Sequence, residues 1–230
     1  MYQWKQAGFV MGIIAGLMGP AAAQTTARPL DTAYANGHYV ARNEVFSKMP
    51  PLRKAVVFLG NSITEAGKWA EILPGVPVQN RGISGDNSFG VLARLPLIVA
   101  GKPAKIFLMI GVNDLKREVP VATIIGNYRR MVDIIRQGSP RTRIYLQSVL
   151  PVNDSMLIEP FRKVTNADVA KLNAALQELA RGKRVCYVNL HEVFADERGQ
   201  LKKDETPDGL HLKIPSYTSW VAYLQRKKYL

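Results

Sequence analysis

The strongest constraint on the fold of this chain is a series of short, continuous apolar runs separated by segments with helical periodicity. Residues 55–59 and 105–110 are almost wholly apolar, and the runs end at Gly60 and Gly111. An apolar run of this length without alternation is typical of a strand buried on both faces of a parallel sheet. Three further candidate strands cover residues 76–80, 142–149 and 185–190. The sequence therefore predicts five strands.

Helical periodicity fills the intervals between these runs. Apolar residues recur at i, i+3, i+4 and i+7 over residues 121–135 and again over residues 169–179. A shorter apolar stripe covers residues 91–95, and we expect Pro96 to break or restart that helix. Residues 31–49 are expected to supply a covering helix. Strands that alternate with helices indicate one α/β domain, open or doubly wound, with a parallel sheet covered on both faces.

The first 23 residues carry the pattern of a secretory signal peptide. Lys5 precedes an apolar stretch over residues 7–18, and three alanines at 21–23 form a small-residue cleavage site. The apolar stretch is shorter than the roughly 20 residues that a membrane span needs, which favours export over a retained N-terminal anchor. We therefore expect cleavage after Ala23, a periplasmic or secreted protein, and no transmembrane span after cleavage.

The 230 residues are enough for one domain after that segment. We divide the chain into the signal peptide, residues 1–23, a leader and covering segment, residues 24–50, and the main domain, residues 51–230. The single cysteine, Cys186, excludes an internal disulfide and a zinc site built on several thiolates.

The net charge is the most unusual number of the composition. The chain has 31 Lys and Arg against 18 Asp and Glu, which gives +13 and favours anionic partners. The basic residues are spread along the chain, and the largest local cluster, Arg226-Lys227-Lys228, is short. Since no DNA- or RNA-binding motif is present either, we expect no nucleic-acid partner.

Polar residues follow several of the expected strands, and the carboxyl ends of parallel strands are where chemistry collects in such sheets. Ser62 comes directly after the first strand, where a helix-capping role is the ordinary alternative. Asn113 follows the third strand, where it could form only an Asx-turn. Near the C-terminus, the carboxylate of Asp208 can hold the Nδ1–H of His211, which leaves Nε2 free to take a proton from a serine.

Taken together, four blocks of the sequence resemble the SGNH/GDSL hydrolases. The blocks are Gly60-Asn61-Ser62-Ile63-Thr64, Asn80-Arg81-Gly82-Ile83-Ser84-Gly85-Asp86, Gly111-Val112-Asn113-Asp114 and Asp208-Gly209-Leu210-His211. They occur in the family's order and span nearly all of the chain after the signal peptide. The resemblance implies a flavodoxin-like, three-layer α/β/α fold with a mainly parallel five-stranded sheet, and ester hydrolysis without metal or organic cofactor.

The resemblance also implies a role for individual residues. Ser62 is the expected nucleophile, His211 the general base and then acid, and Asp208 the residue that orients His211. The backbone N–H groups of Ser62 and Gly85 and the side-chain amide of Asn113 are the expected oxyanion hole. The sequence departs from the family at Asn61, where relatives usually carry Asp before the serine.

These observations favour an exported serine esterase that acts through an acyl-enzyme on short-chain esters or on O-acetyl esters of carbohydrates. The expected partner is therefore a small-molecule, glycan or lipid ester. A lysophospholipase or short-chain lipase of the same fold is the main alternative, since loops set the acyl-chain length. A non-catalytic basic glycan-binding protein is a second alternative. A flavin-binding flavodoxin relative is disfavoured, because the loop after the first strand lacks a run of Ser and Thr for a phosphate.

Overall fold

The computed structural model describes Met1, residues 30–49 and residues 52–230, so the expected signal peptide lies outside the described residues except for Met1. Asp31–Leu230 form one compact unit. Within this unit the described residues include no helix that combines the length and the apolar character needed to cross a membrane.

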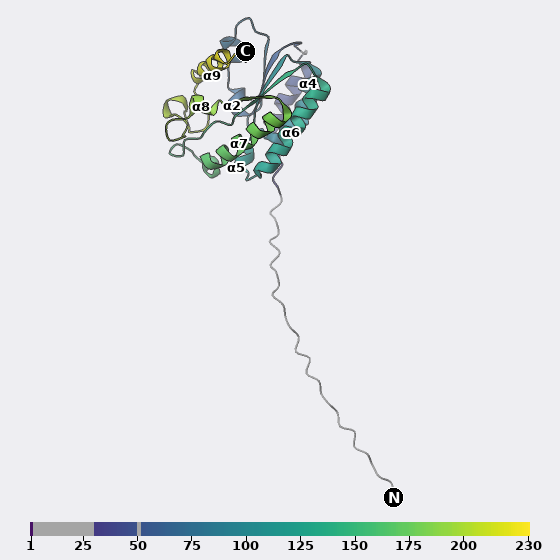
Figure 1. Cartoon of the computed structure of the whole chain (residues 1–230), viewed down its shortest axis with the longest axis vertical. Coiled ribbons are helices and arrows are strands. Elements are labelled where there is room, and N and C mark those ends of the chain that lie inside the picture. Colours follow the sequence, from purple (N-terminus) through teal and green to yellow (C-terminus); the bar gives the residue numbers. More distant parts are fainter. Residues whose placement is uncertain (2–29, 50–51) are drawn as a thin grey trace. The chain divides into compact units, whose positions relative to one another are not determined.

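The centre of the unit is a five-stranded, wholly parallel sheet (Figure 1). Its strand order is β2-β1-β3-β4-β5, the order of flavodoxin-like doubly wound folds. All five expected strands are confirmed, with ends shifted by up to a few residues. Their bounds are β1 (Val56–Gly60), β2 (Val78–Gly82), β3 (Lys105–Met109), β4 (Arg143–Gln147) and β5 (Cys186–Val188).

Helices cover both faces of this sheet and complete the expected three-layer α/β/α architecture, with α8 and α9 on the side opposite α4 and α6 (Figure 1). The first face carries α4 (Ser88–Ala100), α6 (Val121–Gly138) and α7 (Asn166–Lys183). The second face carries α3 (Trp69–Ile72), α8 (His191–Phe194) and α9 (Ser216–Arg226). The short helices α2 (Ser62–Glu65) and α5 (Val112–Lys116) directly follow β1 and β3, and 3₁₀ turns cover Phe161–Lys163 and Lys203–Glu205.

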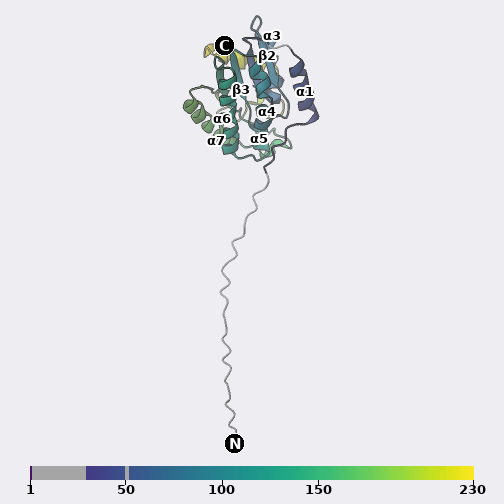
Figure 2. The same cartoon turned by 90° about the vertical axis from the view of Figure 1, so that its right-hand side faces the viewer.

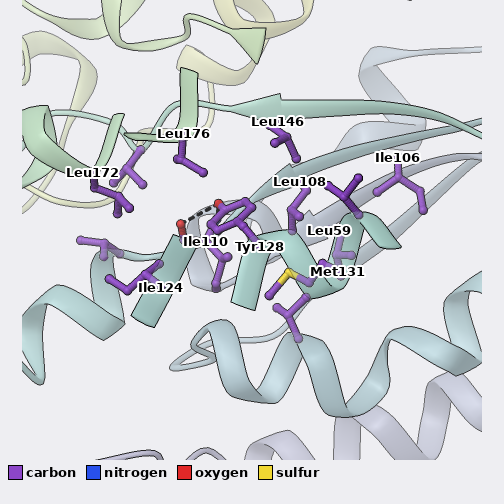
Figure 3. Packing of buried hydrophobic residues seen from close by; sticks show 14 of the residues in the cluster. Leu59, Ile106, Leu108, Ile110, Ile124, Tyr128, Met131, Leu146, Leu172 and Leu176 are labelled. Carbon is purple, nitrogen blue, oxygen red and sulfur yellow. Dashed lines mark hydrogen bonds between the residues drawn. The ribbon is translucent and has the colours of Figure 1, made fainter. Parts of the chain in front are cut away.

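Two apolar cores result from the alternation of side chains along each buried strand. Val57 and Leu59 of β1 pack with α4 and α6, whereas Phe58 packs with Trp69 on the other face. Figure 3 shows the first core around Tyr128, whose hydroxyl donates to the carbonyl of Ile110 and accepts from its N–H. This fully buried tyrosine therefore fixes the backbone just beyond β3, where Asn113 follows.

Helix α4 differs from the expectation at Pro96. The helix runs without a break from Ser88 to Ala100, so the expected interruption was wrong. Proline removes one backbone donor and leaves the carbonyl of Leu92 without its helical partner. Pro96 and Leu97 lie on the exposed side of α4, where solvent can bind backbone groups, and the buried Leu95 and Ile98 hold the helix to the core.

The helix expected over residues 31–49 is α1 (Gly37–Lys48), which flanks the sheet beside β2 (Figure 2). Tyr39 and Phe46 are its buried side chains, and they pack against Ile83 in the loop after β2. The hydroxyl of Tyr39 donates to the carbonyl of Gly90 at 2.9 Å. Helix α1 is thus anchored to the loop that carries the second sequence block.

Candidate active site

Ser62 lies at the carboxyl end of β1, in the first position of α2. The residue that caps this helix is Asn61, whose Oδ1 accepts from the N–H of Ile63 at 3.1 Å. The capping alternative for Ser62 is therefore wrong, and its hydroxyl is available for another partner. Gly60 makes the turn possible, since a Cβ there would lie 2.3 Å from Thr64 Oγ1 and 2.4 Å from the carbonyl oxygen of Met109.

The partner of the Ser62 hydroxyl is His211, 149 residues further along the chain. Ser62 Oγ lies 3.0 Å from His211 Nε2, and His211 Nδ1 lies 2.6 Å from Asp208 Oδ2. The three side chains expected to work together thus form one continuous chain of hydrogen bonds. The bond to Asp208 assigns the imidazole proton to Nδ1 and turns the free lone pair of Nε2 toward the serine hydroxyl.

The loop around Asp208 is arranged to keep its carboxylate ionised. Burial by itself raises the pKa of Asp208, but hydrogen bonds from the His211 ring and from the N–H groups of His211 and Leu210 outweigh it and hold the pKa below its usual value. The side chains of Asp208 and His211 are each 33% exposed, so the site is open to a substrate from solution. An ionised Asp208 stabilises the imidazolium that forms when His211 takes a proton.

The three expected oxyanion donors come from three different segments. The N–H of Ser62 is in the first turn of α2, where amides have no partner inside their own helix. Gly85 has φ +80°, a left-handed conformation that favours glycine, within the turn closed by the bond from Asp86 N–H to the Ile83 carbonyl. Asn113 is buried, and Nδ2 donates one hydrogen to the backbone carbonyl of Asp86 at 2.9 Å. Its second Nδ2 hydrogen is available for a ligand.

A buried arginine that sequence reasoning missed joins the strand ends below this loop. Arg94 of α4 donates through Nε to Asp86 Oδ2 at 2.8 Å. Its two terminal nitrogens donate to the carbonyls of Arg81 and Gly60, at 2.8 and 3.0 Å. Arg94 thus ties together the ends of β1 and β2 and the segment that holds Gly85. The only sequence signal was a charged residue inside an apolar helical stripe.

Asp114 provides a second buried support, on the other side of Asn113. Its carboxylate accepts the Ser88 hydroxyl at 2.5 Å and the Ser88 N–H at 3.0 to 3.1 Å. Burial raises the pKa of Asp114 to about 6, although the hydrogen bonds from Ser88 oppose that change. The contact fixes the start of α4 against α5. Asp114 belongs to the third sequence block, but no pattern in that block predicts its contact with Ser88.

The model of the GDSL-like Lipase/Acylhydrolase family matches residues 58–217, which include the three residues of the hydrogen-bonded chain and all four sequence blocks. The chain belongs to this family. The resemblance read from the sequence is therefore confirmed, and so is the three-layer α/β/α fold.

Two solved structures are similar to most of this GDSL-like chain, and one curated esterase is similar to part of it. A solved Streptococcus pneumoniae protein, provisionally described as a platelet activating factor, is 29% identical with a TM-score of 0.76, over 83% of this chain and 92% of the other. An acetylxylan esterase from Geobacillus stearothermophilus shares the fold at 18% identity, with a TM-score of 0.61 over 77% and 96%. Esterase TesA of Pseudomonas aeruginosa is 34% identical over 100 residues, 43% of this chain.

The curated relatives are matched over only part of their own length. The match covers 50% of TesA and 27% of the N-acylneuraminate cytidylyltransferases of Streptococcus agalactiae, which are 26% identical over 122 residues. The family assignment therefore rests on the family model, and the substrate of this chain has to be argued from its own residues.

Proposed function

We propose that this chain is a serine esterase that hydrolyses carboxylic esters through an acyl-enzyme, with Ser62 as nucleophile, His211 as general base and acid, and Asp208 as the residue that orients His211. The observation that carries the proposal is the unbroken hydrogen-bonded chain, 3.0 Å from Ser62 Oγ to His211 Nε2 and 2.6 Å from His211 Nδ1 to Asp208 Oδ2. A serine hydroxyl is a weak nucleophile until a positioned base removes its proton, and this geometry supplies that base.

Acylation begins when Nε2 of His211 takes the proton of Ser62 Oγ as the oxygen attacks the ester carbonyl carbon. The carbonyl π electrons move to the oxygen, and the resulting tetrahedral oxyanion then collapses with cleavage of the bond to the alcohol oxygen. The departing alcohol oxygen takes the proton from His211. Deacylation repeats these steps with water in place of Ser62 Oγ, which releases the acid and restores the serine.

The oxyanion is the species that the site has to stabilise. Donors from Ser62, Gly85 and Asn113 come from α2, the loop after β2 and α5, and the contacts of Arg94 and Asp114 hold two of these segments in place. Donors fixed before the reaction need no reorganisation as charge develops on the oxygen. This preorganisation supports ester hydrolysis in preference to the alternative of a glycan-binding protein without activity.

For the substrate we propose short-chain acyl esters, including O-acetyl groups on carbohydrates. The family includes acylhydrolases, the relative TesA is an esterase, and one protein of the same fold is an acetylxylan esterase. A lysophospholipase or short-chain lipase would use the same three residues and would differ from this esterase in the acyl chain and alcohol that the site accepts.

The proposal is tested with p-nitrophenyl esters of increasing acyl length and with purified protein in three forms: wild type, Ser62→Ala and Ser47→Ala. Ser47 is the matched control, because its hydroxyl donates to the carbonyl of Glu44 at the exposed end of α1, on an element that holds none of the proposed catalytic residues. We expect kcat for Ser62→Ala to fall by about a million-fold and Ser47→Ala to keep wild-type activity. Equal activity in all three forms, or no activity on any ester, overturns the esterase proposal. Activity that is highest on esters with long acyl chains favours the lipase alternative.

Export is proposed from the sequence of residues 1–23, with Gln24 as the first residue of the mature protein. Cell fractionation followed by N-terminal sequencing tests this proposal. Recovery of Gln24 as the first residue in the exported fraction supports it. A chain that keeps Met1 and stays with the membrane fraction would support the retained anchor instead.

A further inference from the structure

The amino-terminal end of the sheet, opposite the candidate active site, carries a basic hollow. It has a volume of about 700 Å³ and lies at the amino ends of β1, β3 and β4. Six of the ten residues that line it are cationic, and none is Asp or Glu: Arg53, Lys54, Lys102, Lys105, Arg141 and Arg143. We call this hollow the basic cleft. A concave surface lined by one sign of charge concentrates the field and attracts ions of opposite sign.

A second hollow of about 390 Å³ continues the basic cleft toward β5. The two share Pro140 and Arg143, and the second adds Arg136 and Arg184, again with no acidic side chain in its lining. The cationic surface thus runs along the amino ends of four neighbouring strands, β1, β3, β4 and β5. An elongated anion fits this shape better than a single small ion does.

The cations of the basic cleft are not neutralised by the protein. Among the described residues, none of the six has a carboxylate within 4.0 Å, whereas basic residues elsewhere on the surface do, such as Arg181 with Glu178 and Lys171 with Asp168. Other basic residues of the described part of the chain, such as Arg129 and Arg130, also lie in no ion pair, and the basic cleft differs from them because it gathers six such charges on one concave surface. A polyanionic ligand would supply the compensating charge at this surface.

The sheet register brings two of these cations into direct opposition. Lys105 at the start of β3 is the register partner of Arg143 at the start of β4. Like charges opposite each other on neighbouring strands are unfavourable. Burial and the nearby Arg143 both lower the pKa of Lys105. An anion between the two side chains would remove this repulsion, which gives binding a specific electrostatic gain.

We propose that the basic cleft binds a linear polyanion that carries several phosphate groups. A phosphate group presents oxygens in several directions, so it can accept a guanidinium fork from Arg143 and an ammonium from Lys105 at once. A carboxylate has only two oxygens in one plane and accommodates this pair less well. The two adjoining hollows, which share Pro140 and Arg143, favour a chain of phosphates over one isolated group.

The basic cleft and the candidate active site lie at opposite ends of the same strands. Ser62 follows the carboxyl end of β1, and Arg53 and Lys54 precede its amino end. A polyanion in the cleft therefore leaves the serine accessible and would hold the protein on a phosphate-rich polymer. This proposal does not depend on the esterase, and a catalytically inactive Ser62→Ala protein is expected to bind equally well.

The test measures binding of fluorescently labelled, long-chain inorganic polyphosphate to the purified protein by fluorescence anisotropy. We expect saturable binding that weakens as salt is added, because exposed charges are screened. Lys105→Gln/Arg143→Gln should raise the Kd about tenfold, equivalent to about 1.4 kcal/mol. Arg53→Gln/Arg141→Gln should do the same, and it guards against misfolding of the first variant, in which Lys105 loses its bond to the Tyr229 carbonyl.

The matched control is Arg129→Gln/Arg130→Gln, which removes two exposed charges from α6 outside both hollows. If the control weakens binding as much as the cleft variants, attraction is a property of the net charge and the proposal is wrong. If orthophosphate binds as tightly as polyphosphate, the proposal that the ligand is a chain of phosphates is wrong. Equal affinity for polygalacturonate overturns the preference for phosphate, and binding only to phosphatidylglycerol vesicles replaces the polymer with a membrane surface.

Discussion

Glu65 accepts hydrogen bonds from both the backbone N–H and the hydroxyl of Ser84, at 2.6 and 2.5 Å. Glu65 ends the helix that Ser62 begins, and Ser84 directly precedes Gly85. The same carboxylate contacts α1, with His38 Nε2 at 3.1 Å and Arg42 Nε at 2.9 Å. One side chain therefore connects the proposed nucleophile, the oxyanion loop and the N-terminal helix.

Replacing Glu65 with alanine is expected to lower kcat about tenfold with little change in KM, because Gly85 N–H loses its fixed position and donor geometry controls stabilisation of the transition state. Glu65→Gln keeps one oxygen for the Ser84 N–H and should keep most of the activity. Steady-state kinetics on a p-nitrophenyl ester measures both. Glu44→Gln, on the exposed face of α1, is the control. A Glu65→Ala enzyme with wild-type kcat would show that the contact only anchors α1.

Asn113→Ala tests the side-chain part of the oxyanion hole. Loss of one such donor typically costs 100- to 1000-fold in kcat, about 2.7–4 kcal/mol of transition-state stabilisation. Since Asn113 also donates to the Asp86 carbonyl, part of the loss comes from movement of that loop. Kinetics combined with a thermal melt separates the two effects. Full activity in a folded Asn113→Ala protein contradicts the oxyanion role.

Arg94→Met is expected to destabilise the fold by about 3–5 kcal/mol, because it leaves the Asp86 carboxylate buried without its ionic partner. Denaturant unfolding measures this loss. The double variant Arg94→Met/Asp86→Asn removes both charges and should recover part of the stability. If the double variant is no more stable than Arg94→Met, the cost comes from the lost bonds to the Gly60 and Arg81 carbonyls.

Asp114 should make stability fall with rising pH. Its pKa is raised to about 6 in the folded protein and is about 4 in an unfolded chain, so the folded state binds this proton more tightly. The free energy of unfolding therefore decreases from pH about 4 to about 6 and is level above that. Asp114→Asn should reduce this decrease by up to about 3 kcal/mol. Urea unfolding of both proteins at several pH values measures the difference. If the free energy of unfolding falls with pH equally in the wild type and in Asp114→Asn, the proton is bound by another group. Asp86 is then the first candidate, because burial also raises its pKa to about 6.

The sequence predicted a helix or strand well where the distribution of apolar residues reflects which side of the element is buried. The apolar runs of β1 and β3 specify strands buried on both faces, and the periodicity of α6 and α7 specifies helices with one buried side. Pro96 was misjudged, because its effect on α4 depends on which side of the helix faces solvent. The pairing of Glu65 with Ser84 had no sequence signal, since neither residue is unusual for its segment.

The order of the elements, the family and the identity of the proposed catalytic residues follow from local sequence, because they depend on spacing within short segments. The fold alone brings Ser62 within 3.0 Å of His211, although 149 residues separate them. It also lets Arg94 join two strand ends, and places six of the chain's many cations in one hollow. Contacts of this kind form where the ends of neighbouring parallel strands lie side by side. The order and register of the strands decide which ends are neighbours, and no single segment of the sequence encodes them.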